Sequence, residues 1–276
     1  MKYLVLFGLS LFALTSLSAQ TLQGTLKDAK TGETLPFVNV GIVKRDIGTV
    51  SDGDGGFKLV IPEGHSKDTL RISMIGYATR DFIVADAAKL LAANSVLTMT
   101  EEATVLKELV VSNRKRGEKL LGNKTESQSV TGAFTSNKLG NEVGITMKVK
   151  GSLNQLKTFS ASIVSDNNPN VKMRLNFYSL DKKGLPDKLL INENIIVTPP
   201  KNAGKLVVDL MPYNIMVEED FVASLEWIED APGTNKIKFS AAFLATPLVA
   251  RQTSQGEWRK LTGVGLGFTV DTIYWK

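Results

Sequence analysis

The feature that most constrains the fold is an alternation of apolar and polar residues that recurs in many short runs. Val38, Val40 and Ile42 alternate with Asn39 and Gly41. The same period of two recurs at positions 57–61, 70–74, 143–149, 171–177 and 221–227. Successive side chains of a strand point to opposite faces, so each run predicts a half-buried strand.

One segment, 86–93, has a helical composition, since Asp86 can cap a short run rich in Ala and Leu. The other candidate elements are short strands separated by turn residues, for example Asp166–Pro169 and Asp181–Gly184. Many short strands without alternating helices favour sandwiches and jelly rolls over a parallel α/β sheet. The sequence therefore predicts an all-β protein.

Between two of the predicted strands, Asp52–Gly56 has the composition of a tight hairpin turn. Glycine is free to adopt positive φ, and Asp side chains accept hydrogen bonds from nearby backbone amides. The alternative is a calcium loop that uses Asp52 and Asp54. That alternative lacks a third oxygen ligand at the next alternate position and a bidentate Glu at the end of a twelve-residue loop.

The stretch that begins at Leu35 reads LPFVNVGIVKRDIGTVSDGDGGFKLVIP and continues, after a polar loop, as DTLRISMIGY, which ends at Tyr77. Together with Gln23–Leu26 and Thr31–Glu33, it resembles the carboxypeptidase-regulatory-like domain, which is found in many exported proteins of the Bacteroidetes type. The resemblance covers residues 21–112 and implies a transthyretin-like sandwich of the seven-stranded type. It identifies a module rather than an activity.

The N-terminus has the pattern of a secretory signal peptide over residues 1–20. Lys2 precedes the apolar run Tyr3–Leu14, and small and polar residues follow, suited to cleavage after Ala19 or Gln20. The apolar run is too short for a permanent span, so no transmembrane segment is expected in the mature chain. The chain has no cysteine, which excludes disulfides and a lipid-modified cysteine anchor.

Residues 113–128 lose the apolar periodicity and are mainly basic, which predicts a linker between two domains. The alternation then returns, so residues 129–276 are predicted to form a second β-sandwich or jelly-roll domain. The run Arg174–Asp181, with Gly184–Pro186 and Val208–Leu210, is similar to β-sandwich modules of bacterial exported and surface proteins. This similarity covers about residues 142–250 and implies an architecture without a ligand.

Catalytic chemistry is poorly supported by the composition. A catalytic zinc site needs three protein ligands, commonly including two or more histidines, whereas His65 is the single histidine. Cysteine nucleophiles and a G-x-S-x-G elbow are absent, and the glycine-rich Gly263–Gly267 precedes a strand rather than a helix. The carboxylates at Glu218–Asp220 and Glu229–Asp230 are predicted to be solvated turns rather than a glycosidase pair. We therefore expect no enzyme, no catalytic residue, no metal and no cofactor.

Aromatic side chains are the remaining binding signal. Trp258, and Tyr178, which is out of phase with its apolar neighbours, are predicted as ligand-binding residues, because exposed aromatic faces often bind sugars or peptides. The formal net charge of +5 includes a basic cluster at Arg114–Arg116, but the export signal argues against nucleic acid.

The sequence as a whole predicts a non-catalytic exported cell-envelope protein that serves in binding or assembly. The alternative is a carbohydrate-binding or carbohydrate-processing accessory protein. The expected partner is an envelope protein or a glycan. The expected location is the periplasm or the outer membrane, with the cell surface also open.

Overall fold

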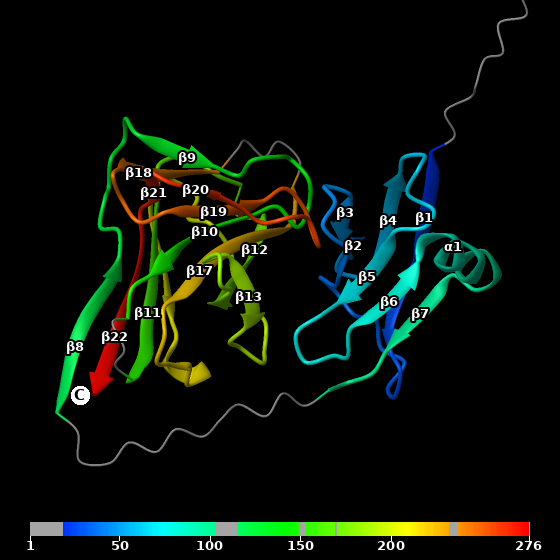
Figure 1. The fold of residues 1–276 in the computed structure, drawn as a ribbon, viewed down its shortest axis with the longest axis horizontal. Coiled ribbons are helices and arrows are strands. Elements are labelled where there is room, and N and C mark those ends of the chain that lie inside the picture. Colours follow the sequence, from blue (N-terminus) through cyan, green and yellow to red (C-terminus); the bar gives the residue numbers. More distant parts are fainter. Residues whose placement is uncertain (1–18, 103–114, 150–152, 169, 232–236, 276) are drawn as a thin grey trace, which may run out of the picture.

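The computed structural model describes residues 19–102, 115–149, 153–168, 170–231 and 237–275. Most of the expected signal peptide, residues 1–18, lies outside these ranges. Almost all of the regular secondary structure of the described residues is strand, in two parts that lie side by side (Figure 1). The prediction of an all-β protein is therefore confirmed, with two sandwich-like parts. No helix among the described residues is long and apolar enough to cross a membrane.

The first part consists of two sheets and one helix. One sheet has the order β4 (Gly56–Ile61), β1 (Gln20–Asp28), β7 (Val96–Met99), and the other has the order β3 (Gly48–Val50), β2 (Asn39–Ile42), β5 (Thr69–Ser73), β6 (Arg80–Ile83). The helix α1 (Val84–Ala93) follows β6, close to the predicted range. The core between the sheets includes Leu26, Val40, Ile42, Leu70 and Ile72, all fully buried.

The tight turn that the sequence predicts at Asp52–Gly56 lies between β3 and β4. Asp52 Oδ1 accepts hydrogen bonds from the backbone N–H of Asp54 at 3.0 Å and of Gly56 at 2.8 Å. Gly55 has a φ of 77°, a conformation that glycine adopts without strain. The Asp52 carboxylate therefore closes a tight turn. The predicted hairpin is wrong, because the turn joins strands of different sheets: β3 pairs with β2, and β4 pairs with β1.

The second part also contains two sheets. The first has the order β13 (Pro186–Leu189), β12 (Lys172–Leu180), β17 (Phe221–Glu229), β10 (Glu142–Met147), β19 (Leu248–Arg251), β20 (Arg259–Leu261), with β14 (Ile195–Val197) also on β12. The second has the order β21 (Val264–Leu266), β18 (Lys238–Phe243), β11 (Leu153–Ile163), β22 (Phe268–Trp275), β8 (Arg116–Gly122), with β15 (Gly204–Asp209) and β16 (Met216–Val217) on β11 and β9 (Thr131–Ala133) on β18. A short 3₁₀ helix, Met211–Tyr213, precedes β16.

The core of the second part lies between these two sheets. The apolar residues of β10, β12 and β17 that the period of two singled out are buried there, as predicted. Aromatic rings from the other sheet complete the core: the ring centroids of Phe159 and Phe268 are 5.5 Å apart, and those of Phe239 and Phe268 are 5.1 Å apart. The polar residues between the apolar ones therefore face away from this core.

The prediction of a linker at residues 113–128 is wrong over much of this range. Residues 116–122 form β8, which pairs antiparallel with β22, and Leu121 is buried opposite Val270. Asn113 and Arg114 lie outside the described residues. The segment is polar because β8 is an edge strand, and charged side chains on such a strand discourage pairing with other chains. Polarity here indicated an exposed edge rather than a linker.

Trypsin should therefore spare β8 in the folded protein. Lys119 lies within the strand, and its Nζ also donates to the carbonyl oxygens of Lys148 and Val149 at 3.3 and 3.2 Å. Cleavage requires an extended and accessible backbone, which a paired strand does not provide. Mass spectrometry of the first fragments from a brief digest should show no cut after Lys119. An early cut there would mean that β8 is detached from β22 in solution.

Candidate functional site

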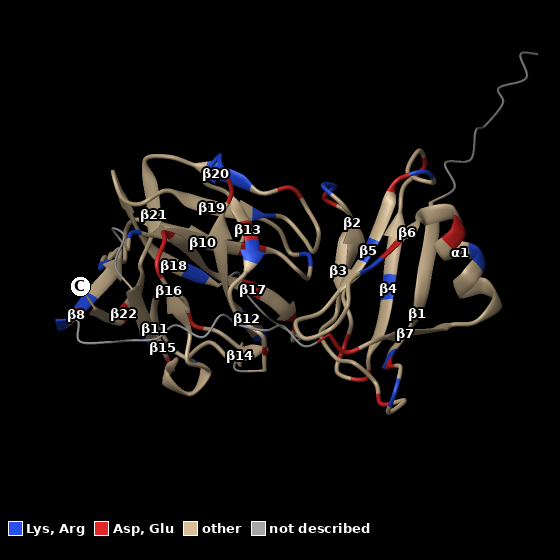
Figure 2. Ribbon diagram, turned by 60° about the horizontal axis from the view of Figure 1, so that its bottom comes forward, with Lys and Arg blue, Asp and Glu red and all other residues tan. Residues whose placement is uncertain are grey.

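The outer face of the sheet that contains β12 is buried around β10, β12 and β17, although many of its residues there are polar. It carries the side chains between the apolar positions of β10, β12 and β17, and the first part covers it with β2 and β3 nearest (Figures 1 and 2). Glu142 and Glu226 have no exposed surface, and Arg174 and Asn176 are 2% and 1% exposed. This group and Arg251, which we call the ionic cluster, is the candidate site.

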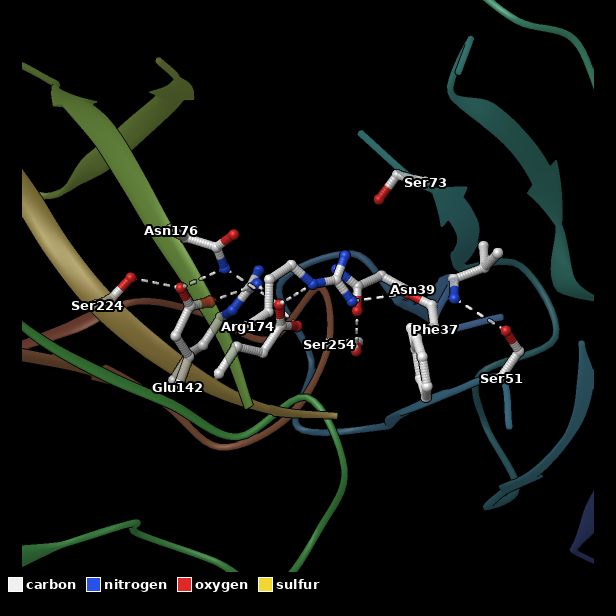
Figure 3. A network of polar contacts seen from close by, with 12 residues as sticks. Phe37, Asn39, Ser51, Ser73, Glu142, Arg174, Asn176, Ser224 and Ser254 are labelled. Carbon is white, nitrogen blue, oxygen red and sulfur yellow. Dashed lines mark hydrogen bonds and ion pairs between the residues drawn. The ribbon is translucent and has the colours of Figure 1, made fainter. Parts of the chain in front are cut away.

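The two carboxylates of the ionic cluster lie on neighbouring strands. Glu142 of β10 is directly opposite Glu226 of β17 in the antiparallel register. Asn176 Nδ2 donates to Glu142 Oε1 at 2.9 Å and to Glu226 Oε2 at 3.1 Å, and Ser224 Oγ donates to Glu142 Oε1 at 2.5 Å (Figure 3). The hydrogen bonds from Ser224 and Asn176 favour the ionised form of Glu142.

Two arginines balance the carboxylates. Arg251 Nη2 lies 2.6 Å from Glu142 Oε2 and 3.4 Å from Glu226 Oε1, and Arg174 Nε lies 3.4 Å from Glu226 Oε2. Burial raises the pKa of Glu142, and the positive charge of Arg251 opposes that shift. Burial by itself would lower the pKa of Arg251, but the negative charge of Glu142 keeps it above its ordinary value. With all four groups ionised, the charges of the ionic cluster sum to zero.

The ionic cluster extends into the first part through one hydrogen bond. Arg174 Nη2 donates to the backbone carbonyl oxygen of Phe37 at 2.7 Å. The ring of Phe37 packs with Val50 and with Ile228 of β17, and Lys172 Nζ lies 5.0 Å from the ring centroid. A buried charge and a small apolar cluster therefore meet at the same point of the interface between the two parts.

The loop between β19 and β20 makes a second set of contacts with the first part. The backbone N–H of Lys44 donates to the Gln255 carbonyl at 2.8 Å, and Ser254 Oγ donates to Asn39 Oδ1 at 2.9 Å. Gly41 of β2 lies against this loop, since a Cβ at that position would overlap the carbonyl oxygen of Ser254. The close approach of the two backbones thus depends on a glycine.

A pocket of about 200 Å³ opens between the two parts and borders the ionic cluster. We call it the interdomain pocket. The first part lines it with residues of β2, β5 and the loop after β5. The second part lines it with residues of β12, β13 and β17 and with the loop after β13. Its lining residues include Ser73, Ile75, Tyr77, Thr79, Arg174, Asn176, Tyr178, Leu189, Ile191 and Glu226. Neither part forms this pocket alone.

Both aromatic residues singled out from the sequence lie at the ionic cluster. Tyr178 is 7% exposed, so the expected exposure of its face is wrong; its O–H lies 3.4 Å from Glu142 Oε2, and burial raises its pKa well above the ordinary value. Trp258 is half-buried, with its ring centroid 5.7 Å from that of Tyr178 and 4.9 Å from the Arg251 guanidinium. Their role in ligand binding stays a prediction.

The other titratable groups considered from the sequence lie elsewhere. His65 is half-buried in its loop, with Nδ1 2.8 Å from Asp68 Oδ2, and this bond lowers the pKa of Asp68. Asp220 pairs with Lys148 at 3.0 Å, and Glu229 pairs with Lys172 at 2.7 Å, as expected for charges beside strand ends. Within the described ranges, no group of three or more His, Asp or Glu side chains is placed to hold a metal ion.

Sequence reasoning missed the carboxylates of the ionic cluster. Glu142 and Glu226 occupy the polar phase of their strands, where a charged residue normally faces water. One signal was available: both acids and Arg174 fall on the same phase of strands whose apolar phases were assigned to one core. Such a charged group on one sheet face is compatible with a second domain packed against it.

The class defined by this fold is an all-β protein of two sandwich-like parts joined over a buried ionic cluster. Residues 22–111 match the family model of the CarboxypepD_reg-like domain, which supports that domain family for the first part. The family resemblance seen in the sequence is thus confirmed for this segment. No curated protein matches the chain.

Solved structures give only distant similarities. The structure of the infectious bursal disease virus Gx strain is 10% identical with a TM-score of 0.25, and that of the Gt strain is 9% identical with a TM-score of 0.27. In both comparisons the match covers 94% of this chain and 63% of the viral chain, so the chain spans less than two thirds of the viral one. Similarities this weak carry no argument about function.

Proposed function

We propose that this chain is a non-catalytic, exported cell-envelope protein that serves in binding or assembly. The observation that carries the proposal is that the buried carboxylates of the ionic cluster are paired within the protein. Glu142 and Glu226 are fully buried. Their oxygens accept hydrogen bonds from Asn176 and Ser224 and form ion pairs with the two arginines. A general acid or base needs a carboxylate oxygen free for proton transfer, whereas each oxygen of Glu142 and Glu226 already contacts a donor of neighbouring strands. A surface built from two parts suits a binding protein.

The envelope location rests on the sequence of the N-terminus and on the domain family. The pattern over residues 1–20 is typical of a signal peptide, and the first part resembles domains of exported proteins of the Bacteroidetes type. We infer a periplasmic or outer-membrane-associated protein, with an envelope protein or a glycan as its partner.

A carbohydrate-binding accessory role is the second candidate. The interdomain pocket favours it, because polar side chains converge there beside apolar ones, as in many small-molecule sites. This role is compatible with the first, since a glycan can be the partner through which an envelope protein is assembled.

Cell fractionation of the native host tests the proposed location and export. When the full chain is expressed, the protein should appear in the periplasmic or outer-membrane fraction, cleaved after Ala19 or Gln20. Leu9→Arg, in the apolar run, should leave the unprocessed chain in the cytoplasm, because a charge there weakens the signal. The matched variant Leu9→Ile should be exported normally. Export of Leu9→Arg at the level of the unsubstituted chain would contradict the proposal.

The absence of exopeptidase activity is a separate expectation. Purified full-length protein should not release C-terminal residues from peptides, since one histidine falls short of a usual zinc shell. Chelator-sensitive release that His65→Ala abolishes would show that the protein is an enzyme after all.

A further inference from the structure

The interdomain pocket has a polar floor with an incompletely paired side chain. Asn176 is 1% exposed and lines the pocket, and among the described residues its Oδ1 has no hydrogen-bond partner. The amide is oriented with Nδ2 towards the two carboxylates, to which it donates at 2.9 Å (Glu142 Oε1) and 3.1 Å (Glu226 Oε2). In Figure 3 the Asn176 oxygen is turned away from those carboxylates. A buried acceptor left unpaired is costly, so it marks a place for a donor.

We propose that the interdomain pocket binds a neutral sugar residue of a glycan, with a sugar hydroxyl donating to Asn176 Oδ1. The inference rests on the proposed binding function and identifies its ligand. It places recognition at the junction of the two parts rather than on the surface of either one.

The charges of the site argue for a neutral ligand. Glu142, Glu226, Arg174 and Arg251 sum to zero when ionised, and the short contacts within the group already pair them. An anionic or cationic ligand would bring an unbalanced charge to a buried site, which is unfavourable in a medium of low dielectric constant. A hydroxyl group avoids this cost.

The remaining lining supplies both kinds of contact that a sugar makes. Ser73 Oγ accepts from Gln255 Nε2 at 2.8 Å, and its own O–H is a donor; the Thr79 hydroxyl can donate or accept. Three apolar residues also line the pocket: Ile75 and Ile191 are buried, and Leu189 is 40% exposed. A pyranose presents hydroxyls at its edge and C–H groups on its faces, so it matches a lining of this mixed character.

The size of the pocket limits the ligand. Its volume of about 200 Å³ is below the roughly 300–1,000 Å³ of usual ligand pockets and equals the space of about seven water molecules in the liquid. This suits one ring of a saccharide, with the rest of the glycan outside. We therefore expect recognition of a single residue.

Calorimetric titration of the full-length protein with methyl glycosides of glucose, galactose, mannose and N-acetylglucosamine tests the inference. At least one should bind, while glucuronate and glucosamine, which are charged, should bind more weakly than their neutral counterparts. Asn176→Leu should lower the affinity about tenfold or more, the effect of losing one hydrogen bond in a buried site.

A second variant leaves the ionic cluster intact. Thr79 is exposed at the pocket, so Thr79→Trp should block it and also weaken binding about tenfold or more, whereas Thr98→Trp on an exposed position of β7 should not change it. Binding by no neutral glycoside, which is the expected result for a pocket that holds only water, would overturn the inference. Equal binding by Thr79→Trp and Thr98→Trp would also overturn it. Export is measured separately, so either result leaves the envelope proposal standing.

Discussion

Arg251→Ala should lower the free energy of unfolding of the second part by about 3–5 kcal/mol, because it leaves Glu142 and Glu226 buried without their shared cation. The melting temperature should fall by roughly 10 °C, given about 2–4 °C per kcal/mol for chains of this size. Thermal unfolding followed by circular dichroism measures the change. The matched variant Arg259→Ala removes an exposed arginine paired with Asp46 at 2.7 Å, and it should cost below about 1 kcal/mol.

The loss of unfolding free energy in Arg251→Ala should depend on pH. The pKa of Glu142 in the folded protein is raised above 4.5 by burial, and removal of Arg251 removes the charge that opposes the shift. A raised carboxyl pKa means that the folded state is penalised at high pH, and the penalty is relieved as pH falls through the folded pKa towards 4.5. The deficit of the variant relative to the unsubstituted protein should therefore be largest near pH 8 and smaller near pH 5. Equal effects of Arg251→Ala and Arg259→Ala, or a deficit that grows on acidification, would contradict this interpretation of the ionic cluster.

Gly41→Leu should separate the two parts without unfolding the first. The new side chain would occupy the position of the Ser254 carbonyl oxygen, so the loop between β19 and β20 cannot remain against β2. The hydrogen bonds from Arg174 to Phe37 and from Ser254 to Asn39 should then be lost. Differential scanning calorimetry should show two transitions for the variant and one for the unsubstituted protein.

The control for this variant is Gly53→Leu in the turn between β3 and β4. A Cβ at Gly53 meets no atom within 4 Å, so the same substitution there leaves the interface undisturbed. It should retain one transition. A single transition for Gly41→Leu at the melting temperature of Gly53→Leu would show that this interface contributes little to the cooperativity.

Much of the fold follows from the alternation of the sequence. The apolar residues of β2, β4, β5, β10, β12 and β17 are buried as their period of two predicts, because local pattern and strand geometry act together. The edge strand β8 was mistaken for a linker, since its burial depends on pairing with β22, more than a hundred residues away in the chain. No local pattern records such a partner.

The candidate site was less predictable than the fold. Tyr178 and Trp258 are predicted to be exposed aromatic residues, yet Tyr178 is buried, because it packs with Val222, Val249 and Trp258 of the second part. Arg174 is buried where it reaches the carbonyl oxygen of Phe37 in the first part. Which face a second domain covers is a property of the assembled chain, and the phase of a strand alone does not determine it.

Small-angle X-ray scattering of the full-length protein tests the central claim, that the two parts are docked in one arrangement over the ionic cluster. The unsubstituted protein and Gly53→Leu should give the same compact profile at all concentrations, reproduced by the docked arrangement alone, and Gly41→Leu should give a larger radius of gyration. A profile of the unsubstituted protein that requires separated and reoriented parts, or that matches the profile of Gly41→Leu, would contradict the account.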